Sequence, residues 1–288
     1  MRLFSLLFTL LALAAPLAAQ DIGFGFRTGL NFNYFVGDKE IGPDGAELES
    51  WENSTGFHIG ASFNVPITDL VGVRAELAYH QAGGRIRYEG PSYFVFPQEG
   101  GNDVVLNGGT RNSLLNITNS YIQVPVLFYY KPFPQLELHG GAYAQVLVSA
   151  TADGQIAYSG PGVEDFALTV SYNYVQDELD TRPTATTETI GLDNGQTIEV
   201  PEAIGAYYFY DERPDGFFNT LDLGLTAGLS YYLNGGLYVG ARGYLGLTDA
   251  TNNDFDRSLQ SLDANDTFVA RTDQDRLLTM QAMVGFLF

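Results

Sequence analysis

The sequence predicts an all-β protein, a transmembrane antiparallel up-and-down β-barrel of eight strands with long extracellular loops. Eight segments alternate between apolar residues and small or polar residues, which is the period of a β-strand. The connections between these segments alternate strictly between short and long. No stretch of about 18 apolar residues follows the N-terminal segment, so a membrane could be crossed only by a closed barrel.

Residues 1–20 have the layout of a secretory signal peptide. One basic residue precedes an apolar run, and small residues end the segment at Ala19. Such a run is too short to cross a membrane as a helix. We expect cleavage near Ala19 or Gln20, which leaves one barrel domain over residues 21–288. Export followed by insertion as a barrel predicts the outer membrane of a Gram-negative bacterium.

The eight predicted strands are roughly ten residues long or longer, which is the length that a tilted strand needs to cross a bilayer. The first strand shows the pattern, because Phe24 and Phe26 share one face while Arg27 and Asn31 share the other. The eight segments are 22–36, 57–65, 71–79, 122–130, 136–148, 221–233, 237–247 and 278–288.

Two classes of connection join these strands. The short ones are turns that contain Pro or Gly, at 66–70, 132–135 and 234–236. The long ones are polar and acidic, at 37–54, 89–120, 151–217 and 248–275. Strict alternation puts all short turns at one rim and all long loops at the other. Outer-membrane barrels have this asymmetry, with the short turns in the periplasm.

The third long loop, 151–217, allows two interpretations. We expect a cap above the membrane whose strands extend the barrel as a hairpin. The alternative is a pair of further membrane strands, which would give a barrel of ten. Acidic residues in this loop argue against its burial in lipid, namely Glu164, Asp165, Asp177, Glu178 and Asp180.

Alternation alone would also fit a soluble barrel whose polar face meets water. The polar face of the predicted strands decides between the two, because it carries mainly Gly, Ser, Asn, Gln and Tyr, as at Gly228 and Tyr244. Such residues suit the crowded interior of a small barrel better than a solvated wall. The apolar face carries no charge in any of the eight strands, which predicts contact with lipid.

The charge of the chain is concentrated in the long loops. The formal net charge is −20, and 29 of the 34 acidic residues lie in the four loops with only 6 of the 14 basic residues. This excess of acid makes nucleic acid an unsuitable partner. We expect weak, dispersed binding of Ca²⁺ or Mg²⁺ by loop carboxylates, with no dedicated metal site and no cofactor.

Six ionisable residues are expected to point into the barrel. They are Arg27, Arg74, Glu76, Glu137, His139 and Arg242. Glu76 and Glu137 could be catalytic carboxylates. We favour a mutually neutralising network that plugs the interior, because buried charges need partners.

The other two histidines should face each other across neighbouring strands, if the turn at 66–70 sets the register. His58 would then lie opposite His80, with both side chains inward near the outer rim. The pair could form a metal or proton site, or simply pack as two polar side chains. We favour the packed polar pair.

Two further features bear on identity. The last strand alternates up to a terminal Phe288, which resembles the signal by which the barrel-assembly machinery recognises its substrates. The chain from residue 22 to the end also resembles the PorT-like outer-membrane β-barrel family. The resemblance is carried by Tyr121-Ile122-Gln123-Val124-Pro125, by Leu221-Asp222-Leu223-Gly224 with Gly228, and by Gly240-Ala241-Arg242-Gly243-Tyr244 leading to Gly246-Leu247-Thr248. It implies a small outer-membrane barrel and, for the founding type, a role in a secretion machinery.

These observations favour a non-enzymatic outer-membrane barrel that acts through its acidic loops, as an envelope-assembly or secretion-associated component or as a surface-interaction protein. Its surroundings would be outer-membrane lipid and lipopolysaccharide, with the barrel-assembly machinery as a partner during biogenesis. One alternative is a narrow pore or ligand transporter gated by the third loop. The other is a lipid-modifying enzyme, which would need His, Ser and an acid on the lipid-facing wall.

The alternation of connections makes a prediction about orientation. The chain contains no cysteine, so a cysteine introduced at Asp44, Asp193 or Asp263 is a unique label. Each should react with a membrane-impermeant thiol reagent on intact cells, while one at Asn234 should react only after lysis. Labelling at Asn234 but at none of the other three would reverse the orientation.

Overall fold

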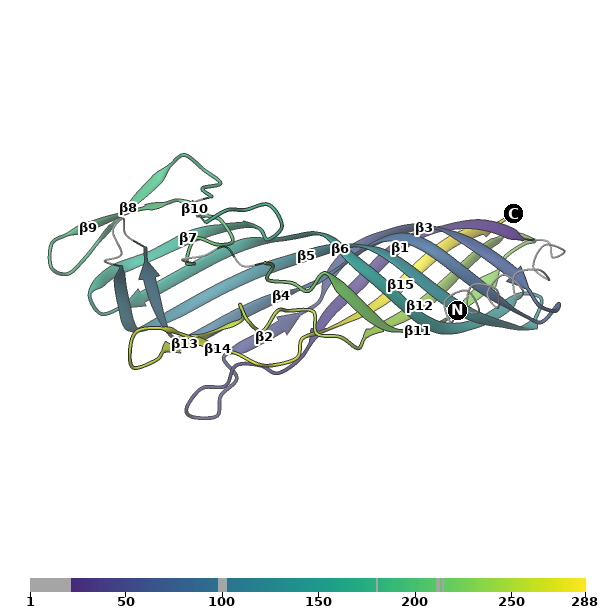
Figure 1. Ribbon diagram of the computed structural model, residues 1–288, viewed down its shortest axis with the longest axis horizontal. Coiled ribbons are helices and arrows are strands. Elements are labelled where there is room, and N and C mark those ends of the chain that lie inside the picture. The colour runs from purple at the N-terminus through teal and green to yellow at the C-terminus, as the bar shows by residue number, and fades with distance from the viewer. Residues whose placement is uncertain (1–21, 98–102, 180, 211–212, 214) are drawn as a thin grey trace, which may run out of the picture.

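The computed structural model describes residues 22–97, 103–179, 181–210, 213 and 215–288 (Figure 1). The expected signal peptide, residues 1–20, lies outside the described residues. In the described part of the chain, no helix has the length and hydropathy needed to cross a membrane.

Eight antiparallel strands close into a barrel, which confirms the predicted fold class. Each strand pairs with the next along the chain in this set, and β15 pairs with β1 over residues 276–287 to close the sheet. The strands are β1 (Gly23–Val36), β3 (Ser54–Pro66), β4 (Val71–Phe96), β5 (Val104–Phe133), β6 (Leu136–Gly160), β11 (Leu221–Tyr232), β12 (Leu237–Gly246) and β15 (Arg276–Leu287).

The three short turns lie where the sequence predicts them, at the end of the barrel that also holds the start of β1 and the C-terminus (Figure 1). Between β11 and β12 the side chain of Asn234 accepts hydrogen bonds from the backbone of Gly236 at 3.1 Å and Leu237 at 2.8 Å. This local bonding fixes the register of the hairpin. In this hairpin Gly228 therefore faces Arg242. In the separate β3–β4 hairpin, His58 faces His80, as the sequence predicts.

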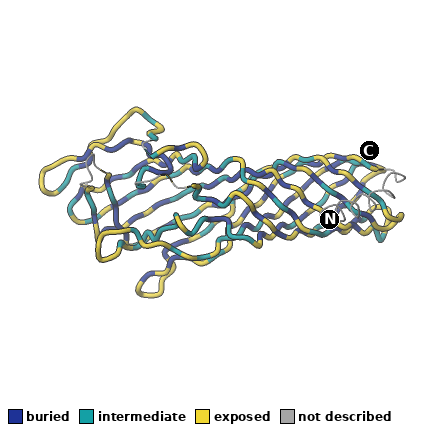
Figure 2. The backbone as a smooth tube through the Cα atoms, in the orientation of Figure 1, coloured by how far each residue is buried: buried dark blue, intermediate teal, exposed yellow. Residues whose placement is uncertain are grey.

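The barrel wall has an apolar outside and a polar inside. Exposed and buried residues alternate along the strands (Figure 2). Phe128 is 68% exposed and Leu30 is 57% exposed, whereas the inward Asn31 and Glu137 are fully buried. A belt of large exposed apolar side chains on a polar interior is the reverse of a soluble barrel, and it marks the surface that contacts lipid.

The expectation that 89–120 is a loop is wrong for the described residues of that segment. β4 and β5 continue far beyond the barrel as a paired ribbon, with Tyr88 opposite Ser113 and Phe96 opposite Val104. β6 extends beside β5 as far as Ser159. The segment is long and polar, which led us to expect a loop, and it lies in the part that projects beyond the membrane barrel. One face of the ribbon is buried, and this burial stabilises it as regular β-structure.

The third long loop adds a hairpin to this projecting sheet, as one of the two interpretations predicts. β7 (Val163–Asn173) pairs with β6 over residues 151–160, while β11 pairs with β6 over residues 136–146. β7 thus stands beyond the barrel portion of β6, and it does not separate β6 from β11. The barrel has eight strands and not ten.

Together these projecting elements form what we call the head, consisting of the described residues of 37–54, 81–120, 147–220 and 248–275. Its core is hydrophobic, unlike the barrel interior, and centres on residues such as Phe94, Tyr158 and Leu168. The smaller elements of the head are β2 (Glu49–Glu52), β8 (Thr187–Gly191), β9 (Thr197–Pro201), β10 (Ala203–Ile204), β13 (Arg257–Leu262) and β14 (Phe268–Ala270).

Candidate functional site

The interior of the barrel is filled by the predicted charged residues, which the structure brings together. Glu76 of β4 lies at the centre of the first group. The Nη1 and Nη2 atoms of Arg242 donate to its two carboxylate oxygens at 2.7 and 3.0 Å, and Nε of Arg27 donates at 2.8 Å. Nε of Arg242 also donates to Nε2 of His139 at 3.0 Å. Two guanidinium groups thus share one carboxylate.

A second group surrounds Glu137. Its Oε2 accepts hydrogen bonds from Nη2 of Arg74 at 2.9 Å and from the hydroxyl of Tyr232 at 2.8 Å. Nη1 of Arg74 lies 2.8 Å from Oε1, but this contact is an ion pair without hydrogen-bond geometry. His139 lies 3.4 Å from the same oxygen and so connects the two groups.

All six of these side chains are shielded from solvent, with residue exposures between 0% for Glu137 and 5% for His139. They come from β1, β4, β6 and β12 and meet across the lumen. Gly228 leaves room for them, because a Cβ atom there would lie 2.8 Å from Nε2 of His139. The arrangement is an interlocked layer of charges, since each carboxylate is bound on more than one side.

The histidine pair lies in a separate polar layer. Nδ1 of His58 is 2.7 Å from Oδ1 of Asn31, and Nδ1 of His80 is 3.1 Å from Nε2 of Gln281. Both rings are buried. Their partners are amides and not carboxylates or further imidazoles, which favours a packed polar pair over a metal site.

A cavity lined by many aromatic residues lies in the head. It measures about 210 Å³ and lies between the β4–β5 ribbon and the third and fourth long loops. Its walls are rich in aromatic residues, and they include the single tryptophan of the chain, Trp51. The other aromatic lining residues are Phe35, Tyr93, Tyr172, Tyr174, Phe209, Tyr210, Phe217, Phe218, Phe255 and Phe268.

Arg111 of β5 lines this cavity and is 7% exposed. Its Nη2 donates to the carbonyl oxygen of Tyr93 at 3.0 Å, and its guanidinium lies over the rings of Tyr93 and Phe94. Its Nε is buried and makes no hydrogen bond, and among the described residues no carboxylate forms an ion pair with it. Burial lowers the pKa of Arg111. Arg111 therefore places a positive charge in the cavity wall that no described carboxylate contacts directly.

The cavity is also lined by members of an acidic cluster, which we define as Glu49, Asp256, Asp273 and Asp275 around Arg271. Arg271 lies 2.9 Å from Glu49, 2.5 Å from Asp273 and 4.0 Å from Asp256. Burial raises the pKa of Asp256 to about 8 despite the opposing effect of Arg271. Burial and the neighbouring Asp273 raise the pKa of Asp275 to about 7. These two carboxyls therefore retain protons close to neutral pH.

Neither the cavity nor the acidic cluster follows from the sequence. Asp273 and Asp275 form an Asp-x-Asp pattern, which was the only local signal, and Asp256 is brought to them by the fold. Arg111 lies within a segment that we expected to be a loop, so its burial gave no signal in the sequence.

The interior network predicts a stability cost for Arg242→Ala. The change leaves Glu76 with Arg27 alone and removes the donor to His139. The free energy of unfolding, measured by denaturant titration in lipid vesicles, should fall by ~3 kcal/mol. Arg85→Ala is a matched control, because the Arg85–Glu52 pair is about half exposed and should contribute about 0 to 1 kcal/mol. Equal effects of the two changes would contradict an interlocked layer.

The same network predicts that the barrel does not conduct ions. Three guanidinium groups and two carboxylates fill the lumen of a barrel whose eight strands leave little more than side-chain space. Purified protein in planar bilayers should therefore give no stable single-channel openings. Large ohmic openings of the unmutated protein would show an open pore instead.

Comparison with known proteins places the chain in a family. A search of curated proteins found no match. Among solved structures, similarity extends to Ail, the attachment invasion locus protein of Yersinia pestis, at 12% identity over 92% of this chain and 99% of that one, with a TM-score of 0.37. OprG from Pseudomonas aeruginosa matches at 12% identity over 93% and 97%, with a TM-score of 0.35. Neisserial surface protein A matches at 11% identity over 91% and 96%, with a TM-score of 0.34.

Residues 18–252 match the family described as outer membrane protein beta-barrel domain. This range includes seven of the eight barrel strands, from β1 to β12. The match agrees with the closed sheet and its apolar outer belt. The chain belongs to the outer membrane protein beta-barrel domain family and is an outer-membrane protein.

Proposed function

We propose that the protein is a non-enzymatic surface-interaction protein, anchored by its barrel, that binds a small amphipathic anion in the cavity of its head. The observation that carries the proposal is Arg111, a buried guanidinium without an acidic partner that lines an aromatic cavity. An uncompensated charge in such a place is costly, and an anionic ligand group would offset that cost.

The rest of the cavity defines the body of the ligand. Aromatic rings on several sides favour an apolar or aromatic body of modest size. Nε1 of Trp51 is a second buried donor without a partner, so it could donate to an acceptor on the ligand. Glu49, which also lines the cavity, forms its ion pair with Arg271 and not with Arg111, so the guanidinium of Arg111 is left to an anionic group of the ligand.

The alternatives fit the geometry less well. A pore or transporter needs an open lumen, whereas the charged layer crosses the lumen here. A lipid-modifying enzyme needs a histidine on the lipid-facing wall, whereas all three histidines point inward and are at most 5% exposed. We therefore propose a binding role in place of catalysis or conduction.

The envelope partners belong to the same proposal. Phe288 is 79% exposed at the end of the last strand, and its backbone N–H donates to the carbonyl of Phe24 at 2.7 Å. That position is consistent with recognition of Phe288 by the barrel-assembly machinery before β1 closes against β15. In this proposal the head would also contact lipopolysaccharide. It would likewise carry the secretion role that the PorT-like resemblance implies.

Trp51 provides the test, because the only tryptophan lies in the cavity wall. In lipid vesicles, octanoate should shift the emission of Trp51 in a saturable way. Octylammonium, of equal length and opposite charge, should bind at least about tenfold more weakly. Ser113→Phe fills the cavity and should abolish the shift, whereas Ser159→Phe, at an exposed position of β6, should not. An unsaturable response, or one that Ser113→Phe leaves intact, would rule out the cavity as the site.

A further inference from the structure

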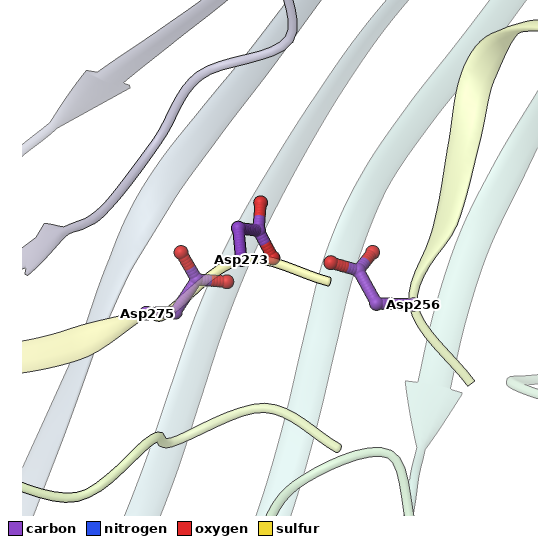
Figure 3. Close-up of side chains that lie close together, drawn as sticks. All are labelled: Asp256, Asp273 and Asp275. Atoms are coloured by element: carbon purple, nitrogen blue, oxygen red, sulfur yellow. The ribbon is translucent and has the colours of Figure 1, made fainter. Parts of the chain in front are cut away.

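The acidic cluster contains a geometry that suits a metal ion. Figure 3 shows the carboxylate of Asp273 between those of Asp256 and Asp275. One oxygen from each of the three lies within 4.8 Å of the others. Two oxygens on opposite sides of a bound Ca²⁺ would be about 5 Å apart, since Ca²⁺–O distances are about 2.3 to 2.6 Å. The three oxygens are close enough together to bind one ion.

The charges of the cluster are not balanced by its own residues. Four carboxylates surround one guanidinium, so three negative charges are in excess when all are ionised. The side chain of Asp273 is only 9% exposed, and that of Glu49 only 7%. Asp249 adds to the negative potential at Asp275. Buried carboxylates in this number require protons or another cation.

A second observation points to a ligand at the same place. The side chain of Asp273 is nine-tenths buried. Its Oδ1 atom is buried with it and accepts no hydrogen bond. Oδ1 of Asp275 is likewise buried and without a partner. Arg271 occupies only the other oxygen of Asp273, through a 2.5 Å contact to Oδ2. Both carboxylates belong to the three that lie close together in Figure 3, and each contributes an oxygen within 4.8 Å of the others.

We infer that Asp256, Asp273 and Asp275 form a dedicated binding site for one divalent cation of the Ca²⁺ type. The ligands are hard carboxylate oxygens, which Ca²⁺ prefers. Asp256 precedes β13, whereas Asp273 and Asp275 precede β15, so the ion joins two ends of the fourth long loop beside the cavity. This site replaces the dispersed binding that the sequence suggests, and it is independent of the ligand at Arg111.

Calcium titration of the whole protein tests the inference. Isothermal calorimetry of the chelator-treated protein in lipopolysaccharide-free vesicles should show one saturable Ca²⁺ site per chain. Tb³⁺ bound there should emit upon excitation of Trp51, which lines the same cavity as Asp256 and Asp275. Ca²⁺ should also slow proteolysis within 248–275, because the ion fixes that segment.

Variants separate this site from the general acidity of the loops. Asp273→Asn and Asp256→Asn should each weaken Ca²⁺ binding at least about tenfold. Asp256→Asn should disturb the fold less than Asp273→Asn, because Asp256 lies 4.0 Å from Arg271 and makes the weaker ion pair. Asp254→Asn is the control, because Asp254 is an exposed acid two residues away. The inference is overturned if the unmutated protein shows no saturable site, or if Asp254→Asn weakens binding as much as Asp256→Asn.

Discussion

The pairing of backbone groups within the hydrocarbon of the membrane is the constraint on which the rest of this structure depends. No water is available there, so every N–H and C=O of the spanning strands needs a partner in the sheet. The pairing of β1 with β15 meets this requirement, because it leaves the barrel without an edge. Closure with only eight strands makes the lumen narrow, and its inward positions must hold side chains that pack against one another.

The interior network follows from that narrow lumen. Arg27, Arg242 and Glu76 are brought within hydrogen-bond distance because strands on opposite sides of a small barrel face each other. In a wider barrel the same residues would line a channel and be solvated. The lumen is thus occupied by structural charge, and this leaves the head as the part of the molecule with space for a ligand. In the function that we propose, recognition and anchoring are carried by different parts of one continuous sheet.

The sequence was sufficient for the barrel because lipid imposes a simple rule, an uncharged apolar face of period two. The same rule does not detect the projecting ribbon of β4 and β5. There, residues such as Arg85 and Glu89 face water, and only the other face of the ribbon is buried. The inward direction of Arg27 and Glu76 followed from strand parity alone. The surroundings of Arg111 and the meeting of Asp256 with Asp273 depend on how the long loops pack against the ribbon, and no local pattern encodes that packing.

The two groups of buried charge differ in a way that bears on how the molecule works. In the barrel, Glu76 and Glu137 are each bound by guanidinium groups, and the layer needs nothing from outside. In the head, Arg111 has no acid partner among the described residues, while the acidic cluster has an excess of acid around Arg271. Charges without a directly bonded partner still have a desolvation cost that distant charges offset only in part, so a bound ion or ligand would stabilise each of them. The charged layer of the barrel is therefore complete as folded, whereas in our proposal the head is completed by an anion at Arg111 and a cation at the acidic cluster.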